Sequence, residues 1–221
     1  MGQESLFPVL SRIRNSQKDF TYCGYGGISQ PIVLSSPSAA RNASANINLC
    51  SYQGGYVEET GSCVCLLLEQ FSQVQFMKFQ GSEALIQQNV AVLPEFPMLS
   101  HLELGLIRFD VFLGLLQRSP ILKTLTFKGI LEFDPELLNS TPVPDCFAST
   151  LQVVKFAKVG GYEHELCLAK YFMENGKLLE RMSFSLASQA LGKSKIMEEF
   201  KEKLFSFKKG FYFAIVEFSY D

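Results

Sequence analysis

The chain has 221 residues, of which 47% are hydrophobic, and 20 Lys and Arg against 22 Asp and Glu leave a formal net charge of -2. Such a composition is sufficient for a sizeable core, but it lacks the basic runs that neutralise phosphates, so nucleic acid is excluded as an expected partner. The longest apolar run, Cys63 to Leu68, is far shorter than the roughly 20 residues of a membrane-spanning helix, so no membrane association is expected.

The first 62 residues are predicted to be an irregular or poorly ordered segment. Their centre, residues 23–50, is rich in Ser, Gly and Asn and shows neither the hydrophobic period of a helix nor that of a strand. The start of the chain lacks a basic stretch followed by an apolar core, so no secretory signal is expected. We therefore predict an intracellular protein of the cytoplasm or the nucleus, and the sequence does not distinguish the two.

Cys63 and Cys65, which open the next region, alternate with Val64 in the way that buried residues of a strand do. A zinc pair is the weaker interpretation, because zinc needs four ligands and no second Cys or His pair follows at a suitable spacing. No metal or other cofactor is expected.

From residue 74 onward, an apolar triad at relative positions 0, 3 and 5 recurs along the chain. Consecutive copies begin 23 to 29 residues apart, and this spacing with an L-x-x-L-x-L core is typical of leucine-rich repeats. The copies are Val74/Met77/Phe79, Leu99/Leu102/Leu104, Leu122/Leu125/Phe127, Leu151/Val154/Phe156 and Leu179/Met182/Phe184.

Residues two apart share one face of a strand, so the last two members of each triad are predicted to point into a common core. One such unit is too small to bury its own apolar row, whereas stacked parallel strands merge their rows into a continuous core. A sixth strand at residues 211–218, with the triad Phe213, Val216 and Phe218, is predicted to close the array.

The segments between the triads favour helical or short returns. Residues 109–120 predict a helix with Asp110 as N-cap, and residues 133–138 predict a shorter one with Asp134 as cap and Pro135 at its first position. Residues 160–176 predict a helix that ends at a left-handed Gly176, and residues 194–205 predict a final amphipathic helix.

The last third of the chain carries a more specific pattern. It consists of a V-P-x-C opening, an L-x-x-V-x-F strand, a Gly followed by an E-x-x-L helix, and an L-L-x-x-M strand. The residues are Val143, Pro144 and Cys146, then 151–156, then Tyr171, Phe172, Glu174 and Asn175 near the helix end, and 178–182. This order resembles the FBD domain of plant F-box/leucine-rich-repeat proteins. Residues 66–79 and 96–105 are similar to the repeats that precede this domain in that family.

The resemblance implies an α/β fold, namely a short irregular leucine-rich-repeat arc of parallel strands with helical or loop returns and a C-terminal FBD-like cap. The predicted domains are 1–62, irregular; 63–142, leucine-rich repeats; and 143–221, FBD-like. Family members usually begin with a helical F-box that contains a Trp and binds the Skp-type adaptor of a cullin ubiquitin ligase. This chain has no Trp, so we expect no F-box, and the Skp-type adaptor is a doubtful partner.

No catalytic constellation emerges, and the chain is predicted not to be an enzyme. A hydrolytic triad needs a nucleophile, a base and an acid, whereas the two histidines, His101 and His164, are better explained as surface residues. The candidate site is a surface formed by the strand residues that point away from the core. These residues are Phe76, Lys78, His101, Glu103, Thr124, Thr126, Lys128, Val153, Lys155, Arg181 and Ser183.

Two functions stay open at this point. The first is a protein-interaction module similar to the substrate-recognition part of an F-box protein, with an unidentified protein target. The second is a truncated or divergent family member without a ligase role, which acts as a decoy or a stand-alone binder.

Overall fold

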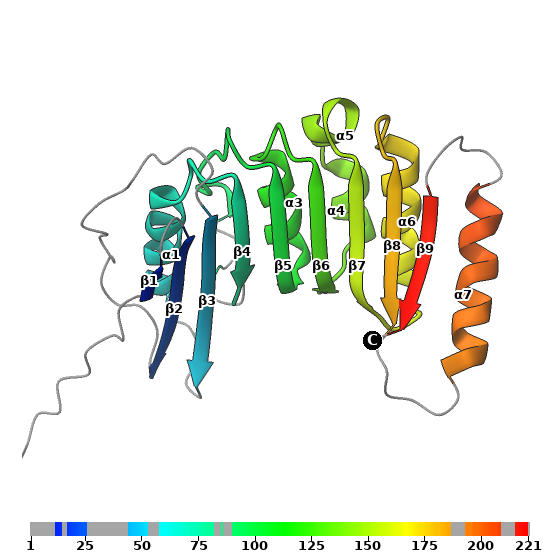
Figure 1. Cartoon of the computed structure of the whole chain (residues 1–221), viewed down its shortest axis with the longest axis horizontal. Coiled ribbons are helices and arrows are strands. Elements are labelled where there is room, and N and C mark those ends of the chain that lie inside the picture. The colour runs from blue at the N-terminus through cyan, green and yellow to red at the C-terminus, as the bar shows by residue number, and fades with distance from the viewer. Residues whose placement is uncertain are drawn as a thin grey trace, which may run out of the picture.

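A computed structural model describes residues 12–14, 17–25, 44–52, 58–81, 85, 90–186, 193–208 and 215–220. Strands and helices alternate along most of these ranges (Figure 1). The strands are β1 (Arg12–Arg14), β2 (Gln17–Tyr25), β3 (Ser44–Tyr52), β4 (Phe76–Gln80), β5 (His101–Arg108), β6 (Thr124–Leu131), β7 (Val153–Val159), β8 (Arg181–Leu186) and β9 (Ile215–Tyr220). The helices are α1 (Glu58–Gln70), α3 (Phe109–Gln117), α4 (Pro135–Ser140), α5 (Asp145–Ser149), α6 (Glu163–Asn175) and α7 (Lys193–Lys208).

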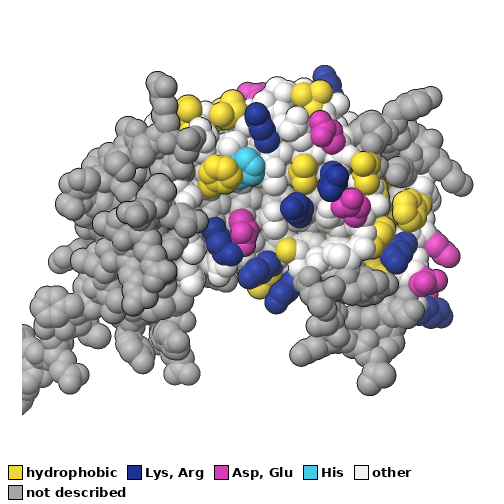
Figure 2. All heavy atoms as spheres, in the orientation of Figure 1, with side chains coloured by type: hydrophobic (Ala, Val, Ile, Leu, Met, Phe, Trp, Pro, Cys, Tyr) yellow, Lys and Arg dark blue, Asp and Glu magenta, His cyan; other side chains and the backbone are white. Residues whose placement is uncertain are grey.

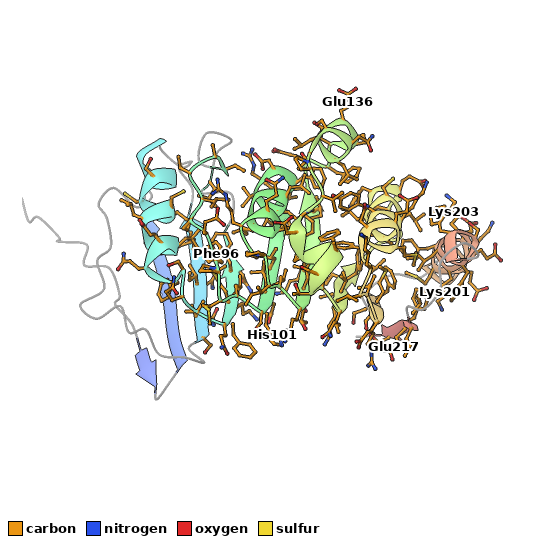
Figure 3. The ribbon with its side chains drawn as sticks, turned by 90° about the horizontal axis from the view of Figure 1, so that it is seen from above. Phe96, His101, Glu136, Lys201, Lys203 and Glu217 are labelled. Atoms are coloured by element: carbon orange, nitrogen blue, oxygen red, sulfur yellow. The ribbon has the colours of Figure 1, made fainter. Side chains whose placement is uncertain are left out.

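These strands form one sheet in which they lie side by side in chain order. β1 pairs with β2 antiparallel, and every later pair of neighbours is parallel. The helices lie on one side of the sheet, as the view from above shows (Figure 3). The predicted α/β arc of parallel strands with helical returns is therefore confirmed.

The five apolar triads form the centre of the core, as predicted. Every triad side chain is buried, the most exposed being Val74 at 6%. Aligned register stacks the phenylalanine rings of neighbouring strands, with centroids of Phe127 and Phe156 4.7 Å apart and those of Phe156 and Phe184 4.6 Å apart. Because each ring covers the next, a single repeat cannot bury its row of apolar side chains without the neighbouring repeats.

The backbone repeats one hydrogen-bond pattern just before each strand. The N–H groups of Ser100 and His101 both donate to the carbonyl of Gln75, and those of Lys123 and Thr124 both donate to the carbonyl of Ser100. The same pattern continues through the starts of β7 and β8. These hydrogen bonds hold equivalent residues of successive repeats next to each other, so the strands start in register.

The helical returns agree with the sequence in outline and differ at two ends. At α4, the Asp134 carboxylate accepts the N–H groups of Glu136 and Leu137, and Pro135 is the first helical residue, as predicted. Asp110 is not the N-cap of α3, because the helix begins at Phe109 and Asp110 lies in its first turn, paired with the Arg108 guanidinium. Gly176 is not left-handed, since its φ is -79°.

The final helix and strand are both present. Phe200 and Leu204 of α7 are buried, and Val216 and Phe218 of β9 are partly buried against the core. Phe213, the first member of the predicted sixth triad, lies outside the described residues.

Irregular structure was the wrong expectation for the described part of residues 1–62, because β2 and β3 extend the parallel sheet there. The polar composition of this segment obscured a two-residue alternation typical of a strand. Ala45, Ile47 and Leu49 are buried, and polar residues alternate with them. The approach of β3 to the repeats is close, since a Cβ on Gly81, whose φ is +93°, would lie 2.3 Å from the Leu49 carbonyl oxygen. The domain limits 1–62, 63–142 and 143–221 stay a prediction.

Cys63 and Cys65 lie in helix α1, so the predicted strand alternation is also corrected. Both side chains are nevertheless buried, because α1 is buried around most of its circumference between residues 61 and 68. Burial raises the pKa of the Cys65 thiol to about 11, which keeps it protonated at neutral pH.

Candidate protein-binding site

The side of the sheet opposite the helices is open among the described residues of the central strands. In Figure 3, His101 and Glu217 point away from the helix layer, whereas Phe96 lies between the sheet and the helices. Figure 2 views this open side directly and shows cationic and anionic side chains intermixed with a few hydrophobic ones. We call this surface the open face and define it by the outward residues of β3 to β9.

Parallel register places the predicted site residues in two rows across the open face. The upper row follows the strand starts, and the lower row lies two residues further along each strand. The upper row is Phe76, His101, Thr124, Val153 and Arg181, and the lower row is Lys78, Glu103, Thr126, Lys155 and Ser183. Lys128 lies two residues beyond Thr126 on β6. The structure thus brings the predicted residues together on one surface, and their role in binding stays a prediction.

A hollow of about 320 Å³ lies at the N-terminal half of the open face, across β3 to β6. The side chains of Phe76 and His101 stack there, with ring centroids 4.3 Å apart and planes inclined by 19°. Phe76 is nevertheless 42% exposed. An exposed aromatic ring at the wall of a hollow is a common contact point in protein interfaces.

His101 is held by its neighbours on the same edge. Its Nδ1 lies 2.8 Å from the Ser100 hydroxyl oxygen, and that hydroxyl donates to the carbonyl of Gln75. Partial burial lowers the pKa of His101 below the ordinary value of 6.5, and the positive charge of Lys123 lowers it further. The ring is therefore neutral at physiological pH and presents an uncharged aromatic surface beside Phe76.

We expect the NMR titration of the His101 ring to show a midpoint below pH 6.5. Lys123→Gln should move that midpoint upward, because it removes the charge that opposes protonation, but burial should still keep it below 6.5. Lys177→Gln, a change of an exposed lysine outside the open face, serves as the control and should leave the midpoint in place. A midpoint at or above 6.5 in the unmodified protein would contradict this account.

Two ion pairs cross between neighbouring strands of the open face. The Lys78 ammonium lies 2.5 Å from the Glu103 carboxylate, and the Arg181 guanidinium lies 3.5 Å from the Glu217 carboxylate. Ser183 donates to the same Glu217 carboxylate over 3.4 Å. All these groups are partly exposed, so the pairs contribute little to stability and are available to a partner.

Four contributors to the open face were not singled out from the sequence, one of them being Glu217 of β9, which pairs with Arg181. Ser44 and Asn46 of β3 line the hollow, and Lys123 precedes β6 close to His101. The alternation of apolar and polar residues at 45–49 was the signal for β3. Lys123 stands one residue before its strand, and no period in the sequence places such a residue on one face.

The second histidine of the chain, His164, lies away from the open face. The His164 ring stacks on Tyr162, 5.4 Å away, and lies beside Phe133, so it belongs to an aromatic cluster on α6 and not to the open face. Within the described ranges, no three side chains of His, Cys, Asp or Glu gather in the way a metal ion requires. No helix in those ranges combines the length and apolar character needed to cross a membrane.

Comparison with known families identifies the C-terminal part of the chain. Residues 139–184 match the family model of FBD, and this range spans α5, β7, α6 and most of β8. This range is similar to the FBD family, and we call it the FBD-like region. The motifs that carried the resemblance in the sequence lie almost wholly within this range.

Similar proteins are found in Arabidopsis thaliana. An FBD-associated F-box protein is 32% identical over 100 residues, which are 42% of this chain and 21% of that protein. Two F-box/FBD/LRR-repeat proteins are each 32% identical, over 82 residues (35% of this chain, 18% of that protein) and over 107 residues (47% and 24%). The match thus spans about a quarter or less of each relative. No solved structure matches the sequence significantly.

Inside the FBD-like region, a buried carboxylate holds the loop between β7 and α6. Glu165 is only 6% exposed, and its two oxygens accept the backbone N–H groups of Gly160, Gly161 and Tyr162 over 2.8 to 2.9 Å. Gly161 has a φ of +83°, and a Cβ on Gly160 would lie 2.3 Å from the Tyr162 ring. Gly160, Gly161 and Glu165 therefore act together to turn the chain into α6.

Proposed function

We propose that the open face binds a protein target, and that the chain is a non-enzymatic interaction module similar to the substrate-recognition part of an F-box protein in a cullin-type ubiquitin ligase. The observation that carries this proposal is the alignment of two rows of exposed side chains across neighbouring parallel strands, with a hollow and an exposed Phe76 among them. Repeat arrays bind partners on such extended surfaces. The relatives named as F-box/FBD/LRR-repeat proteins support the link to the ligase.

A second function, that of a divergent family member with no ligase role, is favoured by a different observation. The described residues of 12–52 form strands that extend the sheet, whereas the F-box of the family is helical. Those residues are therefore committed to the repeat array. In this alternative the chain is a decoy or stand-alone binder.

Site-specific photo-crosslinking tests where the target binds. A benzophenone side chain at Thr126, on the open face, should capture a protein from plant extract, whereas the same group at the exposed Glu136 of α4 should not. The captured protein is then purified, and Phe76→Ser should weaken its direct binding by about ten-fold or more, because an exposed aromatic contact is lost. Equal capture from both positions, or unchanged affinity of the Phe76 variant, would contradict the proposal.

Co-purification with a Skp-type adaptor separates the two functions. The chain and the purified adaptor are mixed and analysed by size-exclusion chromatography, with a complete F-box protein of the family as the positive control. A stable complex supports a ligase component and removes the decoy. Separate elution of this chain, while the control forms its complex, favours the stand-alone binder.

A further inference from the structure

The open face carries a positive charge although the chain as a whole is negative. The two rows of the open face, Lys128, Glu217 of β9 and the residues that precede β6 and β8 together hold five cationic side chains and three anionic ones, and the formal charge of the chain is -2. The cationic side chains are Lys78, Lys123, Lys128, Lys155 and Arg181, and the anionic ones are Glu103, Glu180 and Glu217. The rest of the molecule therefore has an excess of acidic groups, and the positive potential is concentrated on this surface.

Three of the lysines make no ion pair with any residue that the structure describes. Lys78 is paired with Glu103 and Arg181 with Glu217, whereas Lys123, Lys128 and Lys155 have no anionic neighbour within 4.0 Å among the described residues. Binding of an anionic partner by these three lysines therefore breaks no ion pair with a described residue.

The three lysines do not line the hollow, but each is a neighbour of a residue that does. Lys123 is close enough to His101 to lower its pKa. Lys155 is the register neighbour of Thr126, which lines the hollow, and Lys128 follows Thr126 on the same strand. Adjacent strands are about 4.8 Å apart, so the distance from β4 to β7 is about 14 Å, which an extended segment of four to six residues spans.

We propose that the target segment is an extended acidic peptide that crosses β4 to β7, and this inference rests on the proposed function. Its carboxylates pair with Lys123, Lys128 and Lys155, and one apolar side chain enters the hollow against the Phe76 and His101 rings. The neutral His101 ring suits the apolar side chain, and the lysines select the acidic flank. Nucleic acid fits less well, because the chain has a formal charge of -2 and Glu103 and Glu217 interrupt the cationic side chains of the open face.

Fluorescence anisotropy with synthetic peptides tests this inference on the full chain. The probe is a fluorescein-labelled peptide of about ten residues that alternates Glu and Ser around one central Leu. Two further probes of the same length carry Gln or Lys in place of Glu. We expect binding of the Glu peptide only, and a several-fold loss of affinity between about 50 mM and about 300 mM NaCl.

The variants place the charge effect on the open face. Each of Lys123→Gln, Lys128→Gln and Lys155→Gln should weaken binding of the Glu peptide by about two- to five-fold, and the triple variant by about ten-fold or more. The matched control changes Lys177, Lys195 and Lys203 to Gln, since Lys195 and Lys203 belong to α7, Lys177 follows the end of α6, and these exposed lysines give the same change of net charge. It should keep the affinity within about two-fold.

Several results would overturn the inference: no binding of the Glu peptide, equal binding of the Gln peptide, an equal loss in the control variant, or tighter binding of a single-stranded oligonucleotide of the same charge. The cross-linked target separates this failure from failure of the proposed function. If that target loses affinity with Phe76→Ser but not with the lysine triple variant, the open face is the binding site and its selectivity for acidic segments is wrong.

Discussion

Phe156→Ala is expected to lower the free energy of unfolding by about 3 to 5 kcal/mol, the largest effect of any single substitution considered for this protein. Phe156 is 3% exposed and lies in the middle of the stacked rings, with Phe127 at 4.7 Å, Phe184 at 4.6 Å and Phe172 of α6 at 6.2 Å. Its removal opens a cavity that the backbone register does not allow to close, because β7 is tied to both of its neighbours. Urea denaturation followed by circular dichroism measures the change.

Two controls separate the loss of the ring from any change on β7. Phe156→Leu keeps much of the apolar volume and should cost clearly less than the change to Ala. Val153→Thr alters the open face of the same strand and should stay within about 0.5 kcal/mol of the unmodified protein. A loss of less than about 1 kcal/mol for Phe156→Ala would show that the stacked rings do not support the array.

Glu165→Ala is expected to lower the free energy of unfolding by about 2 to 4 kcal/mol, because three backbone N–H groups lose a charged acceptor at once. The donors belong to Gly160, Gly161 and Tyr162, and the tight turn leaves no other described side chain bonded to them. Thermal unfolding by differential scanning calorimetry measures the effect. Hydrogen exchange should additionally speed up at those three amides.

The matched control for this substitution stands two residues earlier in α6. Glu163→Ala removes a carboxylate from the same turn, but Glu163 is exposed and pairs only with the exposed Lys203 over 3.3 Å, so the change should stay within about 1 kcal/mol. Glu165→Gln keeps the size of the side chain and should give an intermediate loss, because its amide group meets an N–H donor. Equal losses for Glu163→Ala and Glu165→Ala would mean that the three hydrogen bonds have no special role.

Both predictions concern residues that the sequence had marked in different ways. Phe156 belongs to a recurring triad, and the triad alone predicted its burial and its alignment with Phe127 and Phe184. Glu165 lies in the segment that carries the E-x-x-L motif, but the motif gives no reason for a glutamate there. The reason is a set of backbone donors, and the sequence does not show where backbone N–H groups point.

The candidate site was likewise predictable from the sequence only in part. Strict two-residue alternation was sufficient to predict that His101, Glu103 and Thr126 face away from the core. The hollow was not predictable, since it depends on how β3 packs beside β4, and β3 was expected to be irregular. The ion pairs of Lys78 and Arg181 likewise depend on which strand lies next to which.

The sequence by itself determined the repeat: residues with a local period of two, recurring every 23 to 29 positions, have to bury their apolar side on neighbouring copies. Only the tertiary structure decided how far the array extends toward the N-terminus, which charges are paired across strands and which lysines are left for a partner. The physical reason is that periodicity is a property of nearby residues, whereas the cross-strand ion pairs and the hollow arise between segments that are 23 or more residues apart in the chain.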